Sequence, residues 1–166
     1  FQRLEELMIY GSYPEIITTD NIEQKKEYLI TLRNSYLFKD IFELDNITNP
    51  SVISDLLKLL AFQIGNEVSL SELGSSLRIA RQTVERYIDL LEKTFILKKV
   101  PGFSRNLRSE VTKTSRYFFY DNGIRNALIN NFNPLDMRND KGMLWENLMF
   151  IERLKKQHYK QIHSNN

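Results

Sequence analysis

Three side chains that hydrogen-bond well to the edges of DNA bases lie close together near the middle of the sequence. They are Arg81, Gln82 and Arg86. Arginine donates two parallel hydrogen bonds to guanine, and glutamine pairs in a similar way with adenine, so this group indicates reading of the major groove. Glu85 and Asp89 occupy the same stretch, and their carboxylates would repel phosphates. We therefore expect any affinity for DNA to be modest.

A basic segment follows this group. Residues 98–116 carry six basic side chains against one acidic side chain. Positive charge on a projecting loop can lie along a phosphate backbone and strengthen binding without reading sequence. We expect Arg105, Arg108 and Lys113 to make such contacts. A basic loop is also often only solvated, so a module that packs against protein rather than DNA stays open as an alternative.

Two helices are expected ahead of the base-reading group. Residues 50–62 are apolar around most of a helical surface, which indicates a buried helix, and Asn49-Pro50 is a typical helix start. Ser69 and Glu72 have the spacing of a capping box, so a short second helix should begin there.

A third helix should carry the base-reading side chains. Apolar residues recur at i, i+3, i+4 and i+7 and must face the core, which turns Gln82 and Arg86 to solvent, while Arg81 opens the helix. Residues 95–97 and 117–120 are aromatic and branched, so they read as strands on either side of the basic loop. This order of elements is that of a winged helix-turn-helix. The last two of the three helices form the helix-turn-helix pair, and the second helix of that pair enters the major groove. The inward-facing residues are Val84, Tyr87, Ile88 and Leu91.

The pattern as a whole predicts a mainly helical protein with a small β-hairpin as the wing. We divide the chain into a helical segment at 1–48, the winged helix-turn-helix at 49–130 and a C-terminal helix at 131–166. The first residue is Phe1 rather than methionine, and it falls inside an expected helix. We therefore expect a fragment of a longer protein.

Composition narrows the possible functions. The 166 residues include no cysteine, which excludes disulfides and thiolate metal sites and fits a cytoplasmic setting. No apolar run approaches the roughly 18 residues of a membrane helix. The net charge of +2 is too small to indicate nucleic-acid binding by itself. His158 and His163 are poorly placed on one helical face, so we expect no metal site, and we expect no catalytic or cofactor-binding residue in the chain.

Five short motifs occur in order: Gly-Ser-Tyr-Pro-Glu at 11–15, Tyr-Leu-Phe-Lys-Asp-Ile at 36–41, Thr-Val-Glu-Arg-Tyr-Ile-Asp-Leu-Leu-Glu at 83–92, Lys113 followed by a strand and Asp-Asn-Gly at 121–123, and Gly-Met-Leu-Trp-Glu-Asn at 142–147. Together they resemble the domain of unknown function 4143, which follows the ATPase core in a family of prokaryotic AAA-type P-loop ATPases. Lys39 stands where that family usually has arginine.

The resemblance implies an upstream core that binds ATP and magnesium. This chain has no Gly-x-x-x-x-Gly-Lys-[Ser/Thr] loop, so we expect a non-catalytic module. Its expected partners are the upstream ATPase domain, double-stranded DNA, and a second copy if the module oligomerises. In some relatives the next region looks like a restriction endonuclease, with a first-helix glutamate that Glu146 would match. The start of a metal-dependent nuclease domain is therefore a further alternative.

Overall fold

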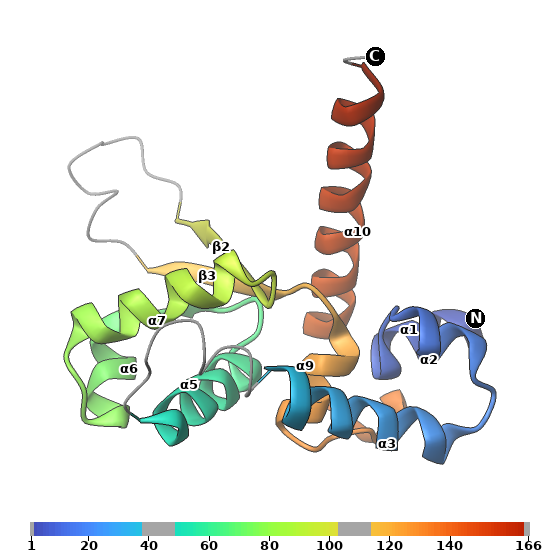
Figure 1. Ribbon diagram of the computed structural model, residues 1–166, viewed down its shortest axis with the longest axis horizontal. Helices are drawn as coiled ribbons and strands as arrows, with labels where there is room; N and C mark the ends of the chain where they lie inside the picture. Colours follow the sequence, from blue (N-terminus) through green and yellow to red (C-terminus); the bar gives the residue numbers. More distant parts are fainter. Residues whose placement is uncertain (1, 38–48, 103–113, 165–166) are drawn as a thin grey trace.

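The computed structural model describes residues 2–37, 49–102 and 114–164, and this part of the chain is mainly helical with one small antiparallel sheet (Figure 1). The helices are α1 (Gln2–Tyr10), α2 (Pro14–Thr18), α3 (Ile22–Leu32), a π-helical turn η1 (Arg33–Leu37), α5 (Pro50–Phe62), α6 (Leu70–Leu77), α7 (Arg81–Lys93), α9 (Asn122–Leu128), a 3-10 turn η2 (Leu135–Met137) and α10 (Lys141–Ser164). The strands are β1 (Glu67–Val68), β2 (Leu97–Pro101) and β3 (Ser115–Phe119).

The local signals for the middle helices are confirmed. The helix α5 begins directly after Asn49, and the Ser69 side chain at the start of α6 accepts a hydrogen bond from the Glu72 amide. The helix α7 buries its apolar stripe, as the i, i+3, i+4, i+7 spacing predicted. The stripe consists of Val84, Tyr87, Ile88 and Leu91.

The sheet has the strand order β1-β3-β2, with both pairs antiparallel. The pairing of β1 with β3 was not expected, because two residues are too few to give a periodic signal. The strand β2 begins at Leu97 rather than at Phe95, because the backbone of Phe95 is left-handed (φ 55°). Leu97 pairs with Phe119 and Val68 pairs with Ser115.

The strand β3 is buried on both faces. Tyr117 and Phe119 are buried on one side, and Phe118 on the other side is buried as well. Phe118 stacks on Phe150 of α10, with ring centroids 4.2 Å apart. The side chains of β3 thus alternate between two faces, and α10 covers the second face at Phe118.

The spacing of Asp20 and Glu23 predicts a capping box ahead of α3, but the capping side chain is that of Asn21. Asn21 Oδ1 accepts from the amides of Glu23 and Gln24 at 2.9 and 3.2 Å. Pro14 predicts a turn after α1, and in the structure it is the first residue of α2. A proline suits that position because its missing amide hydrogen has no partner in the first turn of a helix.

One hydrophobic cluster draws on all three segments of the sequence. It includes Leu29 from the first segment, Leu57 and Tyr87 from the second, and Leu144 from the third. The helix α7 therefore packs, through Tyr87, on a core that all three segments share. Figure 1 shows α10 starting beside α9 and then running outward, away from the other helices.

Two of the sequence motifs meet where α1 ends and α9 begins. The Asp121 carboxylate accepts hydrogen bonds from the Ser12 amide at 2.7 Å and from the Ile124 amide at 3.1 Å. Gly11 has a positive φ of 79°, and a Cβ there would overlap this carboxylate. The close approach of the two motifs therefore requires glycine at position 11.

We expect Gly11→Ala to lower the free energy of unfolding by about 2–5 kcal/mol, combining about 1–2 for a left-handed alanine and about 1–3 for overpacking. Gly142→Ala is the matched control, because a Cβ at Gly142 meets no atom within 4 Å and lies in a helix. This change should raise stability by up to about 1 kcal/mol. Urea denaturation followed by circular dichroism measures both variants, and equal effects would contradict the packing described for Gly11.

Candidate nucleic-acid interface

The exposed side of α7 carries the residues that the sequence singled out. Arg81, Gln82 and Arg86 are all exposed, and so are Glu85 and Asp89. Their exposure follows from the burial of the apolar stripe on the opposite side of the same helix. Arg81 is the first residue of α7, and Ala80 before it contributes no side-chain cap. The first turn of α7 therefore presents arginine and glutamine together at the surface.

Charge on this face is mixed. The Arg86 guanidinium lies 5.3 Å from the centroid of the Tyr87 ring, within the range of a cation–π contact. Further along α7, Glu92 accepts a hydrogen bond from the Lys99 amide at 3.0 Å and pairs with Lys98 at 3.5 Å. Lys98 at the start of β2 thus offsets the negative charge of Glu92, one of the carboxylates of α7.

Some side chains of the basic segment form ion pairs within the protein, and others lie outside the described residues. Lys98 pairs with Glu92, and Arg116 lies 3.6 Å from Glu146 of α10. The expected backbone contacts at Arg105, Arg108 and Lys113 lie outside the described residues. The structure therefore brings together only the α7 part of the expected interface.

Close packing holds α7 against α6 and the sheet. A Cβ on Gly74 of α6 would lie 2.9 Å from the Ile79 carbonyl oxygen, so only glycine lets the turn before α7 approach α6 this closely. Tyr117 of β3 is almost completely buried, and burial raises the pKa of its hydroxyl to about 12, with a smaller contribution from carboxylates of α7. Tyr117 is therefore neutral at physiological pH.

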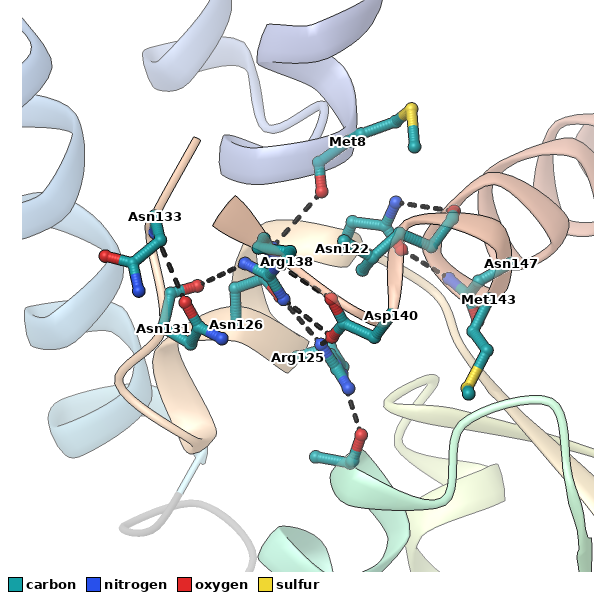
Figure 2. Close-up of polar contacts among 12 residues, drawn as sticks. Met8, Asn122, Arg125, Asn126, Asn131, Asn133, Arg138, Asp140, Met143 and Asn147 are labelled. Atoms are coloured by element: carbon teal, nitrogen blue, oxygen red, sulfur yellow. Dashed lines mark hydrogen bonds and ion pairs between the residues drawn. The ribbon is translucent and has the colours of Figure 1, made fainter. Parts of the chain in front are cut away.

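A buried polar network joins this region to the N-terminal helices (Figure 2). It consists of Arg125, Asn126, Arg138 and Asp140, and we call it the arginine–aspartate network. Arg125 donates from Nε to the carbonyl of Ala61, at the end of α5, at 2.7 Å and from Nη1 to Asp140. Arg138 donates from Nε and Nη2 to the two carboxylate oxygens of Asp140, each at 2.8 Å.

Asn126 extends the network to α1. Its amide nitrogen donates to the carbonyls of Met8 and Ile9 at 3.2 and 2.8 Å. Its oxygen accepts from both Arg125 and Arg138. The network therefore connects α1, α5, α9 and the segment that leads into α10.

The electrostatics of the network favour an ionised Asp140. Burial by itself would raise the pKa of this carboxyl, but hydrogen bonds and ion pairs with Arg138 and Arg125 outweigh burial and hold the pKa at about 2. Both guanidiniums are almost fully shielded from water, with side-chain exposures of 1 % for Arg125 and 0 % for Arg138. A carboxylate shared by two such groups has to stay charged for the network to hold.

A second buried polar contact is centred on Asn147. The position of Glu146 between Trp145 and Asn147 predicts partial burial, but Glu146 is exposed, and Asn147 is the buried member of the Glu-Asn pair. Asn147 accepts from the Phe119 amide and donates to the Phe119 carbonyl, each at 2.8 Å, and donates to Asn122 Oδ1 at 2.8 Å. The Glu-Asn motif thus attaches α10 to β3. These roles of Arg125, Asp140 and Asn147 were missed by the sequence analysis; the available signal was the position of Arg125 and Asn147 within otherwise apolar stretches.

One further cluster resembles catalytic chemistry but lacks room for it. Lys155 donates to Ser12 Oγ at 3.3 Å, and Ser12 Oγ donates to Asp121 at the same distance. The cavity beside them measures about 10 Å³, about the size of one water molecule. Among the described residues, no three histidine or carboxylate side chains are grouped to hold a metal ion. None of the described helices is both long enough and apolar enough to span a bilayer.

We expect Asp140→Asn to lower the free energy of unfolding by about 3–5 kcal/mol, because it leaves two buried guanidiniums without their carboxylate. The folded pKa of about 2 lies below the ordinary value of 3.8. The contribution of Asp140 is therefore complete above 3.8 and is lost as the pH falls toward about 2. The variant should lack this part of the pH dependence.

Urea titrations at several pH values in that range measure both effects. Glu152→Gln is the control, because it breaks an exposed ion pair with Lys155 and should cost less than about 1 kcal/mol. A loss for Asp140→Asn no larger than that of the control would show that the network does not hold the fold together.

The chain resembles several longer proteins. It is 26% identical over 157 residues to an uncharacterized protein of Haemophilus influenzae, covering 89% of the chain and 36% of that protein. It is 25% identical over 154 residues to an uncharacterized protein of Methanocaldococcus jannaschii, covering 90% of the chain and 33% of that protein. The chain thus spans about a third of the length of these relatives, and no solved structure matches it. Residues 1–135 match the family described as Domain of unknown function (DUF8612), and the chain belongs to that family.

Proposed function

We propose that this chain is a non-catalytic C-terminal module of a prokaryotic AAA-type ATPase and that it binds duplex DNA through a winged helix-turn-helix at 49–130. The observation that carries the proposal is the exposed polar face of α7. Arg81, Gln82 and Arg86 lie on this face, opposite the buried apolar stripe. These residue types recognise base edges, and the start of a recognition helix is where such contacts fall.

The order of elements supports this proposal. The order α5, β1, α6, α7, β2, β3, together with the strand order β1-β3-β2, is compatible with a winged helix-turn-helix. Arg105, Arg108 and Lys113 lie outside the described residues, and in this proposal they contact phosphates without reading sequence.

The proposed place within an ATPase rests on the five motifs and on the length of the relatives. Because the chain spans about a third of those proteins, they have room for a nucleotide-binding core. ATP and magnesium would bind to that core. Movement of the core would reach α7 through α1, α9 and α5, which the arginine–aspartate network joins.

A protein-docking module is the second candidate. Several large apolar side chains are exposed, among them Phe62 at 63%, Phe95 at 70% and Met137 at 73%. Apolar side chains mark a site of protein contact where they gather in a contiguous patch. This candidate predicts self-association with no salt-sensitive affinity for DNA. The nuclease alternative would draw on Glu146, which in this structure is exposed and ion-paired with Arg116.

We expect Arg81→Ala to weaken binding to a preferred duplex by roughly 1–3 kcal/mol and to change the sequence preference, if Arg81 pairs with a base in bidentate fashion. Lys58→Ala is a matched control, since Lys58 is an exposed cation on α5 that pairs with Asp55. Fluorescence anisotropy with labelled duplexes at two salt concentrations provides the measurement. If wild-type protein binds no duplex at low salt, the docking candidate replaces this proposal.

A further inference from the structure

The turn between α6 and α7 contains an arginine in an unfavourable backbone conformation. Arg78 caps the C-terminus of α6 with φ 55° and ψ 41°, which is left-handed. Glycine is the usual residue at such a position, because a Cβ there crowds the following carbonyl. The Arg78 amide donates to the Ser75 carbonyl at 3.3 Å, a bond that a glycine amide can make equally well. Glycine would therefore serve the fold better than arginine.

The side chain offers no structural compensation. The Arg78 side chain is exposed and forms no hydrogen bond or ion pair within the described part of the chain. The other two left-handed residues there, apart from glycine, are Phe95 and Asn130. The Phe95 ring packs edge-on against Tyr120, with centroids 5.7 Å apart, and asparagine tolerates this conformation. Arg78 is the case for which the structure itself supplies no reason.

We infer that Arg78 is a phosphate contact at the edge of the α7 face, and this inference rests on the proposed DNA binding. The turn leads directly into Arg81 and Gln82, so a duplex seated on α7 would bring its backbone close to this turn. A guanidinium matches a phosphate well, because its five donors form a planar fork. A solvated arginine could occupy any exposed position without strain. A DNA phosphate bound at this place would explain why an arginine occupies a strained backbone position.

The contact positions the protein on the duplex and does not read sequence. Arg78 and Arg81 would then have different roles. Arg78 would contact a phosphate of the DNA backbone, and Arg81 would contact base edges. This division predicts different consequences for the loss of each side chain.

Arg78→Gly separates the role of the side chain from that of the backbone. Relief of strain should raise Tm by roughly 2–4 °C. Binding should weaken by roughly three- to tenfold for every duplex sequence, and the slope of log K against log salt should fall by about 0.9. Arg78→Lys keeps the charge and should retain most of the affinity. Asn130→Gly makes a comparable backbone change without losing a cation, so its binding should equal that of wild type.

The outcomes distinguish this inference from the function on which it rests. If Arg78→Gly binds DNA as tightly as wild type while Arg81→Ala does not, the phosphate contact is refuted and DNA binding stands. A fall in Tm for Arg78→Gly would refute the strain argument, and Arg78→Asn, tolerated in the same conformation, would then repeat the binding comparison. Absence of any wild-type binding at low salt would overturn both proposals.

Discussion

The carboxylate of Asp140 contacts two buried guanidiniums, and the arrangement of the helices depends on that contact. Burying an unpaired charge is strongly unfavourable, so Arg125 and Arg138 can be buried only where Asp140 reaches both of them. Arg138 and Asp140, from the segment between α9 and α10, accordingly meet Arg125 of α9 (Figure 2). This requirement also aligns Asn126 with the last carbonyls of α1 and Arg125 with the end of α5. Four parts of the chain are thus fixed by one charged centre.

The proposed interface depends on this framework indirectly. The helix α7 packs on α6 and on β2, and α6 packs on α5, whose last turn accepts a hydrogen bond from Arg125. On the other side, Asn147 holds α10 against β3 through the backbone of Phe119. The elements that carry α7 are therefore held in place by hydrogen bonds from Arg125 on one side and from Asn147 on the other. A surface that recognises base edges needs such rigidity, because its donors have to be in place before the ligand arrives.

Local patterns were sufficient to predict the helices that carry the candidate interface. The spacing of Val84, Tyr87 and Leu91 gave both the existence of α7 and its exposed face, because helical periodicity is encoded within a few turns. Contacts between distant residues could not be predicted in this way. The pairing of Arg125 with Asp140, the two-residue strand β1 and the burial of Phe118 by α10 each need a partner that only the folded chain provides. The left-handed conformation of Arg78 was missed because turn chemistry leads one to expect glycine there.

The most direct test of the network's role is hydrogen–deuterium exchange of wild type and Asp140→Asn, resolved by peptide. If Asp140 joins α1, α5 and α9, its loss should weaken the protection of all three helices together, since residues in one cooperative unit open together. Protection of α1 is the decisive observation, because within the described residues the hydrogen bonds between α1 and the network pass through Asn126, which Arg138 links to Asp140. Faster exchange confined to the residues next to position 140, with α1 and α5 unchanged, would contradict this account of the fold.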